Sequence, residues 1–243
     1  MVSGCSHLNL PVQEQRLATA FAGGATLQHG SCLQLHLIHW STGMLPDTQA
    51  ELRRELRRRR RNLSAKEQRI HGKLIARALS RTPLFGHAQR IALYLENDGE
   101  PATGPLIERI SRYGKTCYLP VLRKPPQIGL WFCQYKTGTP LTPNRFGIPE
   151  PRPRQQDRHP PWALDLILLP LVGFDAEGNR IGMGGGFYDR TLGFLRTRRI
   201  WRGPKLIGIA HECQRLERIE PNPWDIPLDG IVTEHGYHPG KTG

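Results

Sequence analysis

The sequence predicts an α/β fold, in which the strands of one sheet alternate with helices. Residues 90–95 are apolar and β-prone, and they lead into an acidic turn. A helix with Thr103 as its expected N-cap and Gly114 as its end comes next, and residues 116–121 form another strand. Strand, helix and strand in this order make the unit from which α/β sheets are built.

A second observation is the apolar run 164–172, which is too short to span a bilayer and has the length of a buried strand. Four glycines in five positions follow a turn, and a helix is expected over residues 187–196. Glycines remove the Cβ atoms that hold a phosphate away, and successive N–H groups can then line one concavity. The loop is Gly182, Gly184, Gly185 and Gly186.

Spacing alone leaves a phosphate site and a tight structural turn equally open, because glycine also serves to reach positive φ. The loop has neither the Lys-Ser/Thr of a Walker loop nor a full G-x-G-x-x-G fingerprint. Arg180 and Arg190 bracket it with positive charge, and Asp189 is within reach of a metal carried on phosphates. These neighbours favour the phosphate site.

The other elements follow in order. A basic helix begins near Thr48, and Ser64 and Glu67 form a capping box that starts a second helix, which ends at Pro83. Further strands are expected over residues 130–135, 205–210 and 230–233, and a proline-rich irregular loop over 140–161.

The composition limits the classes of function that this protein can have. The 243 residues carry a net charge of +13, and residues 51–61 alone hold seven arginines and two glutamates. Such a helix is either a solvated face or an anion-binding face, so nucleic-acid binding is the alternative function, although aromatic residues do not interleave with the basic run. Five scattered cysteines form no C-x-x-C pair, and no signal peptide or membrane span is visible, which predicts a cytoplasmic protein.

Residues 1–43 differ in composition from the rest of the chain, with few charges and many Gly, Ser and Thr residues. We expect a poorly ordered N-terminal extension there and a single α/β domain over residues 44–243. Met44 is a candidate for the natural start.

Several motifs together resemble the 5-formyltetrahydrofolate cyclo-ligase (methenyltetrahydrofolate synthetase) family, from about Asp47 to Thr233. They are the basic helix 52–61, residues 91–95 with Glu100, residues 147–151, Pro170 with residues 173–175, the long stretch 179–190, and residues 224–227. The resemblance implies a mostly parallel central sheet flanked by helices on both faces, an open three-layer αβα fold like that of sugar-phosphate isomerases. It also implies ATP-dependent closure of 5-formyltetrahydrofolate to 5,10-methenyltetrahydrofolate, with Mg²⁺ as cofactor and a monomeric enzyme.

Site residues carried over by resemblance fall into three groups. ATP phosphates are expected at Arg53, Arg180, Ile181, Gly182, Met183, Gly184, Gly185, Gly186, Phe187 and Tyr188, with Arg180 and Tyr188 also catalytic. The folate is expected at Leu95, Glu100 and Phe146, and Mg²⁺ at Asp189 and Asp225.

Structural alternatives stay open for these acids, namely an ion pair of Asp189 with Arg190 or Arg196 and a turn cap by Asp225. A sugar-phosphate-binding domain is a further alternative for the whole chain. His211, at a strand end, is interpreted as a structural histidine. Relatives often carry Lys or Arg where Gln49 stands, which leaves Arg54 or Arg57 to compensate.

Overall fold

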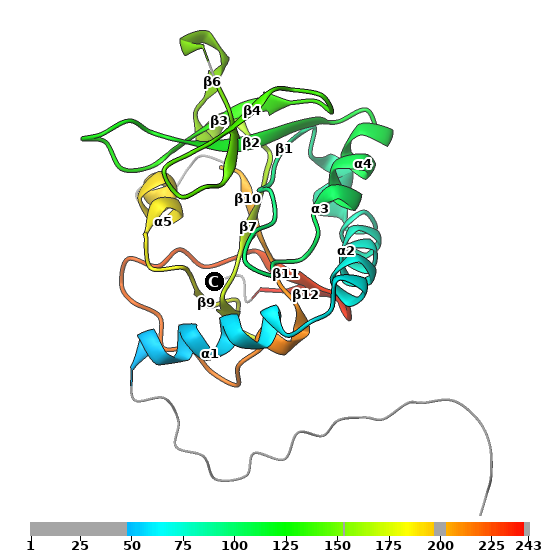
Figure 1. Cartoon of the computed structure of the whole chain (residues 1–243), viewed down its shortest axis with the longest axis vertical. Coiled ribbons are helices and arrows are strands. Elements are labelled where there is room, and N and C mark those ends of the chain that lie inside the picture. Colours follow the sequence, from blue (N-terminus) through cyan, green and yellow to red (C-terminus); the bar gives the residue numbers. More distant parts are fainter. Residues whose placement is uncertain (1–47, 153, 197–202, 241–243) are drawn as a thin grey trace, which may run out of the picture. The chain divides into compact units, whose positions relative to one another are not determined.

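The computed structural model describes residues 48–152, 154–196 and 203–240, and Figure 1 shows its helices and strands. The expected extension 1–43 lies outside the described residues. One eight-stranded sheet has the order β12-β11-β10-β7-β1-β2-β3-β6. Its strands are β1 (Arg90–Ala92), β2 (Thr116–Leu122), β3 (Leu130–Tyr135), β6 (Arg158–His159), β7 (Leu166–Pro170), β10 (Lys205–Ile209), β11 (Gly230–Thr233) and β12 (Gly236–Pro239).

The middle of the sheet is parallel. β11, β10, β7, β1 and β2 pair in parallel, whereas β12, β3 and β6 add to the edges in antiparallel fashion. The carboxyl ends of the five parallel strands therefore lie at one edge of the sheet. In open α/β sheets, ligands bind outside this edge.

Two apolar cores cover the two faces of the sheet. In β7, Leu166 and Leu168 pack with α2 (Ala65–Leu79), α3 (Pro83–His87) and α4 (Gly104–Arg112), while Ile167 and Leu169 pack on the opposite face with Leu192 of α5 (Phe187–Leu192). Figure 1 shows α5 on one side of β7 and β10, and α2 to α4 on the other. The predicted mostly parallel sheet with helices on both faces is confirmed.

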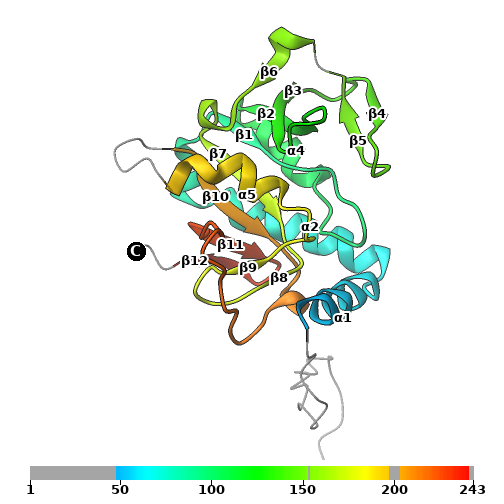
Figure 2. The same ribbon diagram turned by 90° about the vertical axis from the view of Figure 1, so that its left-hand side faces the viewer.

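Helix α1 (Gln49–Arg61) lies across the carboxyl end of the sheet, near β8 (Gly173–Phe174) in Figure 2. Its Leu56 is fully buried in a third cluster with Val172, Ile181 and Ile219. Leu52 packs against the same cluster. The apolar stripe of this otherwise charged helix thus fixes it over the edge at which open α/β sheets bind ligands.

The composition predicted that the arginines of α1 form a single face that is either solvated or binds anions. In the structure they do not act as one face. Arg60 is completely buried, and its guanidinium donates to the Asp98 carbonyl at 2.8 Å, to Oδ2 of Asp98 at 2.8 Å and to the Leu171 carbonyl at 3.1 Å. Arg57 and Arg61 also bind the Asp98 carboxylate. Asp98 has a φ of 55°, a conformation that a short polar side chain tolerates in a turn.

Local signals were reliable at most boundaries, and the Ser64–Glu67 capping box is present. Thr103 stands at the N-cap position of α4, as predicted, but its side chain makes no capping hydrogen bond, because its hydroxyl donates to the Glu96 carboxylate. The helix expected over residues 187–196 ends at Leu192 and continues as the 3₁₀ turn Gly193–Arg196.

The loop expected over residues 140–161 is also more regular than predicted. It contains a hairpin of β4 (Leu141–Pro143) and β5 (Pro149–Pro151), visible in Figure 2, as well as β6 and the 3₁₀ turns Gln155–Asp157 and Pro161–Ala163. Proline is compatible with such edge strands because it lacks only the N–H group.

Candidate active site

A cavity of about 660 Å³ opens beyond the carboxyl ends of β1, β2 and β7. Its walls come from α1, the β4–β5 turn, the glycine loop that joins β9 (Arg180–Ile181) to α5, and the segment 219–225. The structure brings all the sequence-predicted site residues to this one cavity. They are Arg53, Leu95, Glu100, Phe146, Arg180, Ile181, Gly182, Met183, Gly184, Gly185, Gly186, Phe187, Tyr188, Asp189 and Asp225.

The glycine loop leaves its backbone donors available. Among the described residues, no acceptor receives a hydrogen bond from the backbone N–H groups of residues 182–189. The positive φ values of Gly184 (88°) and Gly186 (60°) bend the chain around this concavity. A row of unpartnered N–H groups on a cavity wall is an anion-binding arrangement.

Two carbonyl groups of the same loop accept hydrogen bonds from arginine side chains. Arg53 Nε donates to the Gly182 carbonyl at 2.9 Å, and Arg190 donates to the Gly185 carbonyl. Because these bonds use carbonyl oxygens, they fix the loop without occupying its N–H groups. Each bond also brings a guanidinium close to the place where an anion would lie.

The residues of α1 around Arg53 differ in how they face the cavity. Gln49 accepts from Arg53 Nη2 at 2.8 Å. Arg57 is bound to Asp98, Arg54 is exposed, and neither lines the cavity. Among the arginines of α1, Arg53 is the one that lines this cavity in the part of the chain that the structure describes.

Arg180 and Asp189 form an ion pair, and the Arg180 side chain is only 7% exposed. Arg180 also donates to the Ile226 carbonyl. The alternative of an ion pair between Asp189 and Arg190 or Arg196 is therefore wrong, because the partner of Asp189 is Arg180. Arg180 is positioned by contacts from two segments and reaches the cavity from a largely buried place.

Asp225 caps a turn that begins at Asn222 and not the turn at Pro227, which was the structural alternative expected from the sequence. Its Oδ2 accepts from the backbone N of Asn222 at 2.8 Å and from Asn222 Nδ2 at 3.1 Å. Only Oδ1 of Asp189 and Oδ2 of Asp225 take part in the hydrogen bonds of the described residues, so each carboxylate keeps one oxygen for another partner. Two such oxygens in a cavity are a donor set that fits Mg²⁺.

Glu100 is a buried acid that lines the same cavity, with 8% of its surface exposed. It accepts from the Asn97 N–H at 3.1 Å and lies 3.6 Å from Arg60 Nη2. Burial raises the pKa of the Glu100 carboxyl to about 7, against the opposing effect of the Arg60 guanidinium. A carboxylate in this setting gains most from a ligand that supplies N–H donors.

Phe146 is 54% exposed and meets Phe187 edge to face, with 5.7 Å between the ring centroids. The Arg145 guanidinium lies 5.0 Å from the Phe146 ring. The two rings come from the β4–β5 turn and the start of α5, which are far apart in sequence. They give the cavity an aromatic wall against which a flat ligand can lie.

A family profile for the 5-formyltetrahydrofolate cyclo-ligase family matches residues 46–234, which include all of these site residues. The chain belongs to this family. The match begins after residue 45, so the expected extension 1–43 lies outside it.

Relatives agree with this assignment. The 5-formyltetrahydrofolate cyclo-ligase of Escherichia coli K12 is 41% identical over 180 residues, covering 73% of this chain and 96% of its own length. That of Haemophilus influenzae is 39% identical, over 75% of this chain and 95% of its own. The solved 5,10-methenyltetrahydrofolate synthetase of Aquifex aeolicus has a TM-score of 0.65 and 31% identity, covering 80% of this chain and 93% of its own.

The cyclo-ligase cavity also holds a residue that sequence reasoning missed. Tyr94 lines the cavity and is 5% exposed, and its hydroxyl has no hydrogen-bond partner among the described residues. A buried hydroxyl without a partner is uncommon, because it costs free energy in the folded protein. No local signal distinguishes Tyr94 from any other strand tyrosine. None of the described helices is long and apolar enough to cross a bilayer.

Proposed function

We propose that this cavity is where the cyclo-ligase closes 5-formyltetrahydrofolate to 5,10-methenyltetrahydrofolate and converts ATP to ADP and phosphate. The observation that carries the proposal is the row of unpartnered N–H groups of residues 182–189 on the same cavity as the buried Glu100. The N–H groups of the loop are suited to phosphates, and the Glu100 carboxylate is suited to the N–H donors of a reduced pterin.

The chemistry needs an activated oxygen, because the formyl oxygen of an amide is a poor leaving group. Transfer of the γ-phosphoryl group of ATP to that oxygen releases ADP and creates a phosphate ester. N10 of the folate then attacks the formyl carbon and loses its proton, and phosphate departs. The protein contributes chiefly by holding both substrates in line and by stabilising the moving negative charge.

The phosphate side of the cavity would be formed by the glycine loop. Backbone N–H groups of residues 182–189 would bind the phosphate oxygens, with positive charge from Arg53 and Arg180 nearby. Burial, and then the Glu100 carboxylate, raise the pKa of the Tyr188 phenol. Tyr188 therefore stays protonated and can donate a hydrogen bond to the transferring phosphoryl group.

On the folate side, Glu100 would accept from the pterin N–H groups, and Phe146 and Leu95 would pack against the ring system. The unpartnered Tyr94 hydroxyl would donate to a folate oxygen. Each assignment uses a group whose bonding capacity is not met within the described residues or whose surface is exposed to the cavity.

Asp189 and Asp225 would hold Mg²⁺ through their remaining oxygens. When bound, the ion supplies neutralisation of the phosphate charge. The Asp189–Arg180 pair would keep the acid in place at the side of the nucleotide.

The test mixes the full chain with 5-formyltetrahydrofolate, ATP and Mg²⁺ and follows the absorbance of the methenyl product. We expect product formation that requires all three additions and yields one ADP per product. Product formation without ATP, or ATP turnover unaffected by the folate, would contradict the proposal.

The nucleic-acid alternative receives no support from α1. Arg57, Arg60 and Arg61 bind Asp98, whereas Arg58 and Arg59 bind Glu55. Five of the seven arginines in residues 51–61 are therefore held in place by ion pairs with these two carboxylates. Added RNA should neither change the rate of cyclisation nor bind with the steep salt dependence of a phosphate-contacting protein.

Residues 1–43 are proposed to be dispensable for this reaction. A chain that begins at Met44 should keep kcat and both KM values within about twofold, since the family match starts at residue 46. A folded truncation without activity would show instead that the extension takes part.

A further inference from the structure

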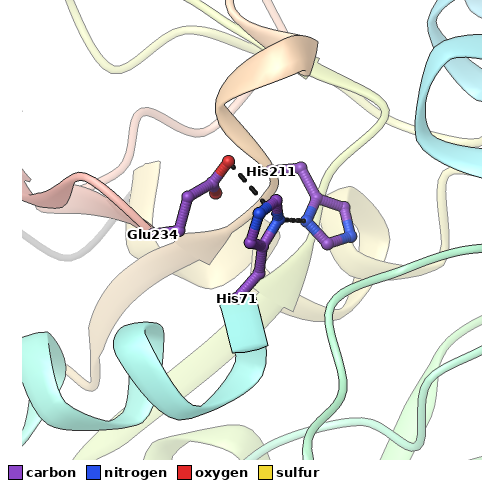
Figure 3. A group of neighbouring side chains, drawn as sticks. All are labelled: His71, His211 and Glu234. Atoms are coloured by element: carbon purple, nitrogen blue, oxygen red, sulfur yellow. Dashed lines mark hydrogen bonds and ion pairs between the residues drawn. The ribbon is translucent and has the colours of Figure 1, made fainter. Parts of the chain in front are cut away.

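Two histidines and one acid meet outside the cavity, on three separate elements (Figure 3). His71 comes from α2, His211 follows the end of β10, and Glu234 follows the end of β11. One ligand atom from each of the three lies within 4.8 Å of the others. His71 Nδ1 is 2.9 Å from His211 Nδ1 and 3.4 Å from Glu234 Oε1.

The tautomer of His211 can be worked out from its partners. Its Nε2 lies 3.2 Å from the Gly99 carbonyl, which can only accept, so Nε2 carries the proton. The His211 ring is completely buried, a setting that favours the neutral imidazole. The neutral ring therefore directs the lone pair of Nδ1 toward His71.

Glu234 is also held in place. Both of its carboxylate oxygens accept from the backbone N of Glu212, at 3.1 and 3.2 Å. The His71 Nδ1 atom thus faces two acceptors, the His211 lone pair and the Glu234 carboxylate. A single proton on His71 is shared between them, and a cation at the same place would satisfy all three groups at once.

We propose that His71, His211 and Glu234 form a binding site for one zinc-class divalent cation. Two nitrogens and one carboxylate oxygen are ligands typical of zinc, and they leave a fourth position open to water. With metal–ligand bonds of about 2.0–2.1 Å, tetrahedral ligand atoms lie roughly 3.3 Å apart, close to the 2.9 and 3.4 Å that separate His71 Nδ1 from His211 and Glu234. For Nδ1 of His71 to bind the cation, the neutral ring takes the tautomer that carries its proton on Nε2.

The outer partners have the form expected around a metal. The Gly99 carbonyl orients His211 through Nε2, and the Glu212 N–H orients Glu234. Nitrogen ligands disfavour Mg²⁺, so the site is distinct from the one proposed at Asp189 and Asp225. A bound cation would join α2 to the ends of β10 and β11 and, through His211, brace the Gly99 segment beside Glu100.

The test is a zinc titration of the untagged full chain in competition with a chromophoric zinc indicator, with excess Mg²⁺ present. The variants are His71→Ala and Glu234→Gln, which remove one ligand each without emptying the buried His211 position. His235→Ala is the matched control, because His235 is the neighbour of Glu234 and its side chain is 66% exposed. The difference from wild type removes any contribution of other histidines and cysteines.

We expect one zinc equivalent that both variants weaken at least roughly tenfold and that the His235→Ala control retains. Zinc should also raise the Tm of the wild type and the control but not that of His71→Ala. The proposal fails if zinc binds equally to wild type and both variants, if the control loses the same equivalent, or if no zinc binds. Since the readouts are binding and Tm, such a failure would leave the cyclo-ligase reaction at the cavity untouched.

Discussion

Arg53 Nε donates to the Gly182 carbonyl at 2.9 Å, a bond between residues that are 129 positions apart in the sequence. It fastens helix α1 to the glycine loop and places a guanidinium beside the unpartnered loop N–H groups. The basic helix and the glycine loop, two separate motifs in the sequence, therefore form one wall of the cavity.

Arg53→Ala should raise the KM for ATP by tenfold or more and leave the KM for the folate within about twofold. The variant loses both a charge near the phosphates and the bond that fixes the loop, and a hydrogen bond to a charged group contributes roughly 1.5–3 kcal/mol. Steady-state kinetics with each substrate varied measures this. Arg54→Ala is the control, since Arg54 is exposed on the same helix and does not line the cavity. Equal effects on both KM values would remove the phosphate role from Arg53.

Glu100 should make folate binding depend on pH. Its pKa is raised to about 7, and only the ionised carboxylate accepts from two pterin donors, so the KM for the folate should fall as the pH rises from 6 to 8. Glu100→Gln should bind the folate weakly at all these pH values while ATP still binds. Titration of each ligand separately against the variant checks this, and unchanged folate affinity would contradict it.

Ionisation of Glu100 should favour folate binding but lower the free energy of unfolding. Because the pKa of Glu100 in the folded protein is raised above the ordinary value of 4.5, its contribution to stability is fully present below pH 4.5 and is lost as the pH rises through 7. Glu100→Gln should therefore be more stable than wild type at pH 8, by up to about 3 kcal/mol, and similar to it near pH 4.5. Urea unfolding at both pH values measures the difference. Parallel curves for the two proteins would mean that Glu100 does not titrate in this range.

Gly182→Ala should fold normally and still impair ATP use. A Cβ at Gly182 meets no atom within 4 Å and the φ is not positive, so the fold tolerates the methyl group, which instead enters the space where phosphate would lie. We expect an unchanged Tm and a several-fold higher KM for ATP. Gly86→Ala is the matched control, because its Cβ also meets nothing within 4 Å but it lies in α3, away from the cavity. An unchanged KM for ATP in Gly182→Ala would argue against phosphate binding at this point of the loop.

Tyr94→Phe should make the free protein more stable and weaken its binding of the folate. The variant removes a buried hydroxyl that has no partner in the described residues, so the free protein should become more stable, by about 1–3 kcal/mol. If the hydroxyl donates to the folate, the KM for the folate rises at the same time. Thermal unfolding with and without folate tests both parts. A loss of stability in the free protein would mean that the hydroxyl has a partner such as bound water.

Much of the fold followed from local chemistry that the sequence displays directly. The capping box at Ser64, the strands and the glycine loop depend on neighbouring residues, and so their order and type could be predicted. The loop over residues 140–161 was harder, because its short edge strands are defined by partners elsewhere in the chain rather than by an apolar pattern.

The sequence by itself determined which residue types would form the cavity, because the motifs carry them in a fixed order. Only the tertiary structure decided how they are used: Arg60 is buried against Asp98, Asp189 pairs with Arg180, and the Tyr94 hydroxyl is left without a partner. His71 and His211, 140 positions apart, meet for the same reason. Such contacts arise from how the helices pack onto the sheet, and packing partners far apart in the chain leave no local pattern to read.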